Sequence, residues 1–280
     1  MPELPEVETV CRALAPFVTD QTFAAARVHW ARTVEPHDPA GFVATIPGKR
    51  VLSVSRRAKL IVFELSDDLV LTTHLRMTGN LRFIGVDSEP EIAPQQHLRL
   101  EFDFESGDAL HFYDARKFGR VRLYSSAEWA GYQSTAFGPE PLDPALDGRT
   151  FAAMLQSRKR QVKPLLLDQT FIAGIGNIYA DESLFKARIH PLQPASTIST
   201  RKARELHQAI VETLEAAIAN HGTTLRNYRS ALGEAGENQR ELLVYGAAKD
   251  APCPRCGTKL RKIVVGQRGT TFCPRCQPMR

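Results

Sequence analysis

The middle of the chain alternates between apolar and polar residues. Within residues 97–104, one face of an extended chain would be apolar and the other charged; the apolar positions are Leu98, Leu100, Phe102 and Phe104. This period of two predicts a half-buried antiparallel strand. A Ser-Gly-Asp turn at 106–108 leads into a second run at 109–113, so the two runs should form a hairpin.

Five other short apolar runs are bounded by turn-forming residues and predict strands at 51–55, 60–65, 69–74, 81–84 and 121–124. Several short strands separated by turns are typical of a sandwich or a flattened barrel. We therefore expect an antiparallel β-sandwich in the N-terminal half of the chain.

A helical period appears in two parts of the chain. From Leu4 onward Val7, Val10, Cys11 and Leu14 recur at helical spacing, and Pro5 stands in the first turn, where its missing N–H costs little. This helix should flank the sandwich. Further helices are predicted at 151–156, 163–169, 177–187 and 201–220; the last has a buried stripe at Leu206, Ile210, Leu214 and Ala217/Ile218.

Segments rich in glycine and proline divide the chain into units. Residues 134–149 are polar and contain three prolines and two glycines, which predicts an interdomain linker. His221-Gly222 stops the last helix, and residues 223–240 resemble a mobile loop. An α+β multidomain chain follows, with units at 1–133, 150–246 and 247–280 around the 134–149 linker.

Composition excludes several classes of protein. Of the 280 residues 43% are hydrophobic and 24% are charged, and no apolar run approaches the length of a membrane span. The N-terminus carries acids where a signal peptide needs bases, so we expect a soluble, intracellular protein. Residues 247–280 hold eight lysines and arginines against Asp250, a net +7, whereas the rest of the chain sums to −2. Such a basic segment points to a polyanionic partner.

Four of the five cysteines lie in that basic segment. Two Cys-Pro-Arg-Cys knuckles are separated by 16 residues, and their cysteines are Cys253, Cys256, Cys273 and Cys276. Two such knuckles on a hairpin are typical of a structural zinc site, because four thiolates leave no open position for water. Two disulfides are the alternative, which an intracellular protein disfavours. The hairpin strands should be 259–265 and 270–272, with Arg268 in a turn over 266–269; Cys11 should be a buried apolar residue.

The N-terminus combines a proline with two acids. Removal of the initiator methionine would free a secondary amine at Pro2, close to Glu3 and Glu6 and to the positive end of a helix. That dipole disfavours the ammonium form, and an α-amino group already titrates near pH 7.7–8.0 in peptides. The pattern is compatible with a nucleophilic amine. Taken alone, it favours an ordinary helix start that begins with a proline.

Two loops each place one large apolar residue in a polar, glycine-bounded turn: Met77 within 74–79 and Phe118 within 114–119. Each could be a core plug or a wedge that fills the space of an extruded nucleotide, with Arg116 reading the orphaned base. A glycine-rich turn before Asn177 opens a helix and suits a phosphate. Lys59, at the start of an apolar strand, is either a solvated cation at the sheet edge or a cation with a role in a functional site.

Together these motifs resemble the bacterial formamidopyrimidine-DNA glycosylase family over essentially the whole chain. The resemblance rests on 1–9, 56–59, 74–79, 114–119, 168–182, 189–191, 244–246 and the four-cysteine hairpin. It implies a β-sandwich joined to a helix-two-turn-helix domain with a zinc finger and one structural Zn²⁺. The implied function is a base-excision-repair glycosylase and AP lyase for 8-oxoguanine and formamidopyrimidines.

The resemblance also implies roles for individual residues. Pro2 would attack C1′ of the damaged nucleotide, Glu3 would donate a proton to the sugar ring and Glu6 would support it. Lys59 and Arg268 would contact phosphate and assist β- and δ-elimination. The remaining DNA-binding residues would be Met77, Gln95, Arg116, Lys117, Phe118, Lys159 and Asn177.

Two residues and one loop depart from the family pattern. Lys117 stands where a second arginine is usual and loses bidentate phosphate geometry, and Gln95 stands where a phosphate-binding histidine is expected. The lesion-capping loop reads Glu-Ala-Gly-Glu-Asn-Gln at 234–239 instead of carrying a Pro-Gly-aromatic element.

Three other functions explain part of the pattern. They are an endonuclease VIII-like glycosylase for oxidised pyrimidines, a non-catalytic binder of damaged DNA, and a zinc-ribbon transcription or RNA-binding module. The favoured function implies a monomer acting on double-stranded DNA with oxidised bases or abasic sites, in the nucleoid of the bacterial cytoplasm and without a membrane.

Overall fold

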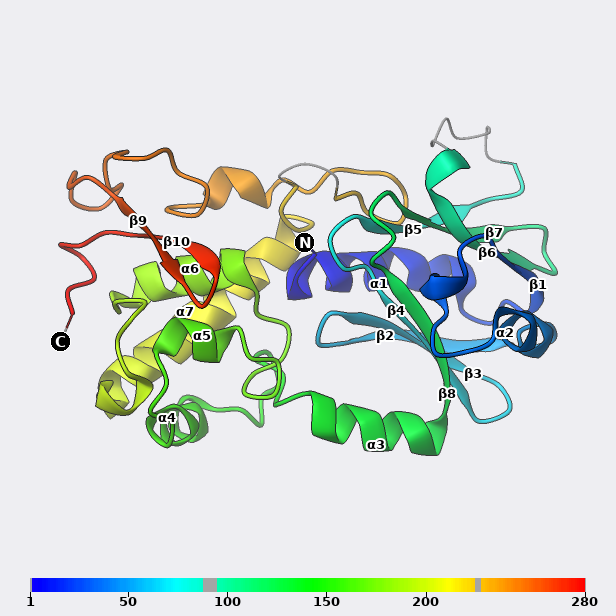
Figure 1. Cartoon of the computed structure of the whole chain (residues 1–280), viewed down its shortest axis with the longest axis horizontal. Helices are drawn as coiled ribbons and strands as arrows, with labels where there is room; N and C mark the ends of the chain where they lie inside the picture. Colours follow the sequence, from blue (N-terminus) through cyan, green and yellow to red (C-terminus); the bar gives the residue numbers. More distant parts are fainter. Residues whose placement is uncertain (1, 88–94, 225–227, 280) are drawn as a thin grey trace. The chain divides into compact units, whose positions relative to one another are not determined.

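The computed structural model describes residues 2–87, 95–224 and 228–279. The chain forms two compact units, which Figure 1 shows with the sequence running from blue to red. The first unit comprises Met1–Ser134 and Asn220–Glu237, and the second comprises Thr135–Ala219 and Asn238–Arg280. No helix in the described ranges is long and apolar enough to cross a membrane.

The first unit contains two four-stranded antiparallel sheets, as the alternating pattern predicts (Figure 1). One sheet has the order β1-β6-β7-β5, built from Phe23–Val28, Leu98–Phe104, Ala109–Asp114 and Gly79–Ile84. The other has the order β2-β3-β4-β8, built from Val51–Arg57, Leu60–Leu65, Leu69–His74 and Arg120–Ser125. The predicted sandwich is confirmed.

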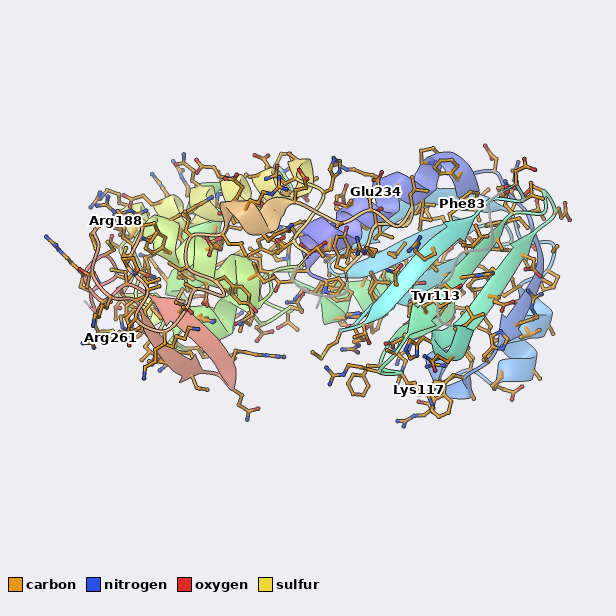
Figure 2. All side chains as sticks on the ribbon, turned by 90° about the horizontal axis from the view of Figure 1, so that it is seen from above. Phe83, Tyr113, Lys117, Arg188, Glu234 and Arg261 are labelled. Carbon is orange, nitrogen blue, oxygen red and sulfur yellow. The ribbon has the colours of Figure 1, made fainter. Side chains whose placement is uncertain are left out.

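The first helix, α1 (Leu4–Val18), packs against strands of both sheets: β2 and β3 in one, β5 in the other. The predicted stripe of Val7, Val10, Cys11 and Leu14 is buried in the same core as the inner residues of the sheets. Phe83, at the end of β5, lies beside α1 (Figure 2), where its ring stacks on Phe17 with centroids 4.9 Å apart. Burial of this stripe fixes the orientation of the helix on the sandwich.

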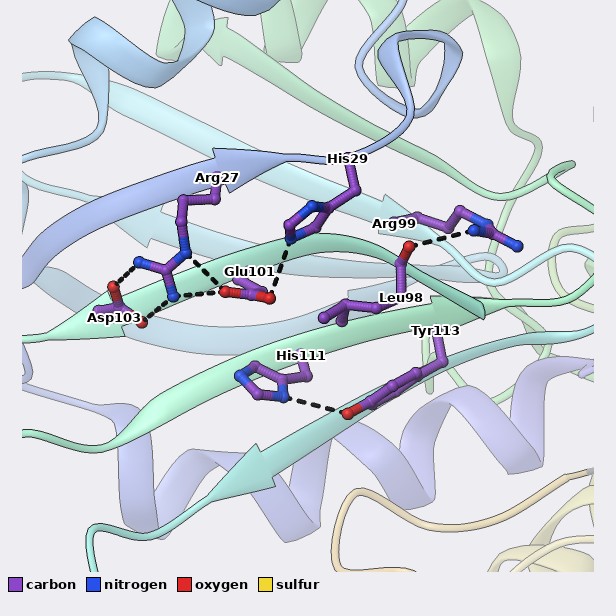
Figure 3. Close-up of polar contacts among 8 residues, drawn as sticks. All are labelled: Arg27, His29, Leu98, Arg99, Glu101, Asp103, His111 and Tyr113. Atoms are coloured by element: carbon purple, nitrogen blue, oxygen red, sulfur yellow. Dashed lines mark hydrogen bonds and ion pairs between the residues drawn. The ribbon is translucent and has the colours of Figure 1, made fainter. Parts of the chain in front are cut away.

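The outer face of the first sheet is polar (Figure 3). Arg27 donates to Glu101 (2.7 Å) and also pairs with Asp103, and His29 lies 2.9 Å from Glu101. Arg99 belongs to the face of the strand that the alternation predicts to be charged, but unlike Glu101 it is buried. Only 8% exposed, it donates to the carbonyl oxygens of Leu98 (3.1 Å) and Asp114 (2.9 Å), because the end of the strand needs donors for otherwise unpaired carbonyls.

The second unit is mainly helical. Its helices are α4 (Gly148–Gln156), α5 (Val162–Leu166), α6 (Asn177–Ala187) and α7 (Thr200–Ala219), and its hairpin is β9 (Arg261–Val265) with β10 (Arg268–Phe272). Helix α7 packs on α4 and α6 through the predicted stripe, although Ile218 is only partly buried. Helix α5 ends earlier than predicted, because the backbone carbonyl of Asp168 accepts from Phe171 and Ile172 in a separate turn.

Three elements escape the sequence patterns: β1, α2 (Pro39–Thr45) and α3 (Ser126–Ala136). Half of strand β1 is alanine, and Trp129 is the one buried residue of α3, so neither shows a strong period. The expected linker 134–149 contains the end of α3 and the start of α4. Between them, Gly138 donates to Gln169 and Pro139 accepts from Ala173. The domain boundaries expected from sequence stay predictions.

Candidate functional site

Pro2 is buried two residues before α1 begins. Glu3 is the residue before the first helical turn, with extended backbone, and Glu6 lies within that turn; their exposures are 2% and 1%. The positive end of the helix dipole therefore faces the position of the Pro2 nitrogen, as the sequence predicts. Met1 lies outside the described residues.

The Glu6 carboxylate holds two segments together. It accepts hydrogen bonds from the backbone N–H of Glu3 (2.7 Å) and of Thr223 (2.7 Å), a residue 217 positions away. The Tyr228 hydroxyl donates to the Glu6 carbonyl (3.1 Å), and burial raises the pKa of that phenol well above its usual range. Glu6 thus connects the start of α1 to the segment that follows α7. The sequence indicated support by Glu6 but could not identify these partners.

Gly222 lies against this connection. Its φ is +81°, and an added Cβ would approach Glu6 Cγ to 3.0 Å and Glu6 Cα to 3.2 Å. Gly222→Ala should therefore lower the free energy of unfolding by about 2–3 kcal/mol, from left-handed backbone strain plus overpacking. It should also lower by about tenfold the rate of the reaction that the sequence predicts for Pro2, because a small displacement of a positioned group is costly.

Gly48→Ala is the matched control for this prediction. Gly48 has nearly the same φ, +79°, but nothing lies within 4 Å of its Cβ position. It should cost about 1 kcal/mol of stability and leave the reaction rate unchanged. Denaturant unfolding and single-turnover kinetics measure both quantities; equal effects of the two substitutions would contradict a role for contact with Glu6.

Lys59 and His74 lie at one end of the second sheet. Lys59 is 7% exposed in the turn between β2 and β3, and His74 pairs with the next residue, Leu60. Burial lowers the pKa of His74 to about 3, aided by the charges of Arg76, Lys59 and Arg122. The imidazole is therefore neutral near pH 7. Its Nδ1 accepts from the Arg76 N–H (3.0 Å), which leaves Nε2–H as a donor. No role was predicted for His74 from sequence, although it opens the 74–79 loop segment that contains Met77.

The two wedge candidates meet in space. Arg116 lies between them: its guanidinium is 4.8 Å from the centroid of the Phe118 ring and donates to Met77 Sδ (3.0 Å). Met77 is 44% exposed and Phe118 is 48% exposed. These side chains are therefore not core plugs. An exposed apolar pair around an arginine can enter a base stack, as the wedge interpretation requires.

Asp114 organises both wedge loops. It is 1% exposed and accepts from the backbone N–H of Arg116 (3.1 Å) and Gly119 (2.6 Å). The hydroxyl of Thr78, in the other loop, donates to the same carboxylate. This role was not predicted from sequence. The one signal was the position of Asp114, an acid at the end of a strand and directly before a turn that ends in glycine.

Lys117 and Gln95 were the doubtful DNA contacts. Lys117 adopts a left-handed backbone (φ +60°), and its ammonium lies 4.0 Å from the centroid of the Trp30 ring; Figure 2 labels it beside the first sheet. Gln95 begins the 3₁₀ turn Gln95–His97, and its side chain lies outside the described residues. The predicted roles of both residues in DNA binding stay predictions.

The four predicted metal ligands converge in the second unit. All four Sγ atoms lie within 4.8 Å of one another; the Cys253–Cys276 and Cys256–Cys273 separations are 3.9 and 3.6 Å. A tetrahedral site with Zn–S bonds of about 2.3 Å requires sulfur atoms about 3.8 Å apart. The cysteines are free thiols, so the disulfide alternative is not realised. The residues fit a zinc ion.

The turn of the zinc hairpin differs from the prediction. Only Gly266 and Gln267 form it, both with positive φ, and Arg268 opens β10 opposite Val265. Two positive φ values give the twist that a two-residue hairpin turn needs. Arg268 therefore projects from the strand directly after the tip and remains exposed.

A buried lysine fixes the hairpin to the helices. Lys163 is fully buried, and its ammonium contacts Asp181 (2.6 Å), the Thr270 hydroxyl (2.7 Å) and the Gly269 carbonyl (3.1 Å). Burial raises the pKa of Asp181 to about 6, although the Lys163 charge opposes the rise. Asn177, at the start of α6, also donates to Gly269 (2.9 Å). The structure thus brings Asn177 close to the Arg268 segment.

Other predicted elements occupy different places in their units. Lys159 is exposed in the loop between α4 and α5. The loop expected to be mobile contains a turn at 230–234 and meets β5 through Phe83 N–H and Ala231 carbonyl (3.1 Å); residues 225–227 lie outside the described ranges. Glu182, which sequence reasoning missed, accepts from three successive backbone N–H groups at 243–245.

Comparisons with known families divide the chain into three matches. The formamidopyrimidine-DNA glycosylase N-terminal domain matches residues 1–121, and the formamidopyrimidine-DNA glycosylase H2TH domain matches residues 137–229. A zinc finger found in FPG and IleRS matches residues 251–278. The four cysteines fall inside the third match.

Individual relatives match over nearly the whole length. A formamidopyrimidine-DNA glycosylase of Chloroflexus aurantiacus is 44% identical, with 99% of this chain and 98% of the relative covered. A Lactococcus lactis FPG variant bound to Fapy-dG containing DNA is 38% identical (TM-score 0.89, covering 99% and 100%). The L. lactis Fpg complex with abasic-site DNA is 37% identical (TM-score 0.88, covering 99% and 99%).

Proposed function

The chain belongs to the formamidopyrimidine-DNA glycosylase family, and on this premise we propose that Pro2 is the nucleophile of a bifunctional DNA glycosylase and AP lyase. The substrates are oxidised purines, 8-oxoguanine and formamidopyrimidines, and the reaction belongs to base excision repair. The observation that carries the assignment is the buried Pro2 at the positive end of α1, with Glu3 and Glu6 beside it.

The reaction needs a free amine and a proton donor. The Pro2 nitrogen attacks C1′ and loses its proton, the N-glycosidic bond breaks, and the base departs with the bonding electrons and takes up a proton. Glu3 protonates the ring oxygen as the sugar opens, which leaves an iminium between Pro2 and C1′. A secondary amine suits this step because its imine is permanently cationic and accepts electrons.

Elimination follows from that iminium. Loss of a C2′ proton expels the 3′ phosphate, and a second elimination expels the 5′ phosphate. Lys59 and the neutral Nε2–H of His74 supply donors for phosphate at one end of the second sheet. Arg268 and Asn177 supply donors in the second unit, where Lys163 and the zinc hairpin hold the segment in place. Met77, Arg116 and Phe118 fill the space of the extruded nucleotide.

Borohydride trapping tests this function. Borohydride reduces an iminium to a stable amine, so protein and DNA should become covalently joined when the duplex carries 8-oxoguanine, a formamidopyrimidine or an abasic site. Thymine glycol in the same panel distinguishes an endonuclease VIII-like preference for oxidised pyrimidines from a preference for oxidised purines. Each lesion is placed opposite each of the four bases. An undamaged duplex is the control. Absence of trapping with every damaged duplex would contradict the proposal.

The same proposal covers location and assembly. We propose that the protein acts as a monomer on duplex DNA in the bacterial cytoplasm. The relatives are bacterial, and the L. lactis neighbours are complexes with DNA that contains a damaged base or an abasic site.

A further inference from the structure

A basic recess lies on the second sheet and includes His74. Its empty volume, including open solvent at its mouth, is about 320 Å³. Three arginines and one histidine line it together with two tyrosines, a leucine and a threonine: Arg76, Arg120, Arg122, His74, Tyr124, Tyr132, Leu60 and Thr72. No role in the proposed mechanism uses Arg120, Arg122 or the tyrosines.

Strand register explains why these residues share one face. His74 of β4 pairs with Leu60 of β3 on one side and with Arg120 of β8 on the other. Two residues along, Thr72 pairs with Arg122. Side chains two residues apart point to the same face of a sheet, so both arginines project beside His74. Both arginines of the recess are therefore held by the sheet itself, while Arg76 and Tyr132 join them from the loop after β4 and from α3.

The positive charge in the recess is incompletely neutralised. The Arg122 Nε donates to a backbone carbonyl, that of Glu35 (3.1 Å), and Arg120 donates to the Gly119 carbonyl (2.8 Å). The Glu35 carboxylate is 3.9 Å from Arg120 and half exposed. Within the described ranges Arg122 forms no ion pair with a carboxylate. Backbone carbonyls orient the guanidinium groups and leave their charge available to an anion.

An aromatic wall closes one side. The rings of Tyr124 and Tyr132 stack with centroids 5.6 Å apart and an interplanar angle of 20°, and Trp129 supports both. Such a wall excludes water from one side of the cationic group, which strengthens its attraction for an anion. It also offers an apolar surface to a sugar attached to that anion.

We propose that Arg122 and Arg120 bind a phosphate group in this recess, next to the His74 donor already assigned to phosphate in the elimination. The inference rests on the proposed function in so far as the phosphate belongs to the DNA backbone; a free phosphate ion has the same chemistry. Arginine is suited to either, because its planar fork donates two parallel hydrogen bonds to phosphate oxygens.

Salt dependence of DNA binding provides the first test, with a duplex that carries a tetrahydrofuran abasic analogue. Each phosphate contact contributes about −0.9 to the slope of log K against log salt. Arg122→Gln should make the slope less negative by about this amount and weaken binding about five- to tenfold at 0.15 M salt. Arg122→Lys should restore most of the slope. Arg50→Gln, at the opposite end of β2 and half exposed, is the control and should change neither quantity.

Neutral methylphosphonate linkages then locate the phosphate. At one position in the DNA, replacing the phosphate by a neutral linkage should lower the affinity of the wild type but not lower that of Arg122→Gln any further. This result assigns the phosphate to the DNA backbone. If inorganic phosphate instead raises the unfolding temperature of the wild type and not that of Arg122→Gln, with DNA binding the same in both proteins, the ligand is free phosphate. If Arg122→Gln folds normally and changes neither readout, the recess proposal is wrong. Trapping by the wild type is scored separately, so failure of the glycosylase function is recognised independently.

Discussion

A chain with one extra glycine in front of Pro2 should form no borohydride-trapped complex with abasic or 8-oxoguanine duplexes. The extra residue converts the proline amine into a peptide nitrogen, whose lone pair is delocalised and cannot attack C1′. The fold should be kept, because α1 starts only at Leu4 and its stripe is untouched. Trapping yield and single-turnover base release measure the loss, which should exceed about 1,000-fold.

Pro2→Gly is the companion variant. It retains an N-terminal amine, but a primary one, so weak trapping should persist while base release falls by about 100-fold or more. Intact mass of active wild-type protein should show that Met1 is absent. Trapping by the extended chain at the wild-type level would place the nucleophile elsewhere, with Lys59 as the first alternative because it is nearly buried.

Cys256→Ala should remove zinc and disable DNA binding. Structural zinc sites of this type contribute about 10–16 kcal/mol of apparent binding free energy, which here stabilises the hairpin that carries Arg268. Without it the contacts of Lys163 and Asn177 with Gly269 should be lost. Affinity for duplex DNA should fall by about two orders of magnitude, since several phosphate contacts are lost together. Elemental analysis gives zinc per chain, and fluorescence anisotropy gives affinity.

Cys11→Ala is the control for thiol loss. Cys11 is 4% exposed, its Sγ donates to the Ser55 carbonyl (3.1 Å), and burial raises the pKa of the thiol far above its usual range. It should cost about 1–2 kcal/mol of stability through the lost packing, with zinc content and DNA affinity unchanged. Full DNA affinity of zinc-free Cys256→Ala would show that the hairpin does not contribute to binding.

Local sequence patterns predicted the elements whose residues follow a regular period or spacing. The alternation around Leu98–Phe104, the stripe of α1 and the knuckle spacing of the cysteines each correspond to an observed element. The same reasoning missed β1 and α3. Half of strand β1 is alanine, and the strand lies at a sheet edge; α3 buries little more than Trp129. Neither element therefore shows a clear period of apolar residues.

By itself, therefore, the sequence determined that the N-terminal half is rich in strands and the C-terminal half in helices. It also determined the zinc ligands and the candidate nucleophile with its two acids. Each of these features depends on neighbours within a few residues. Only the tertiary structure decided what Glu6, Asp114 and Lys163 do: their partners lie 217, 36 and 107 positions away. It also decided that Arg120 and Arg122 stand beside His74 across a strand pair. Such contacts arise when distant segments close on one another, and no local period encodes which segments meet.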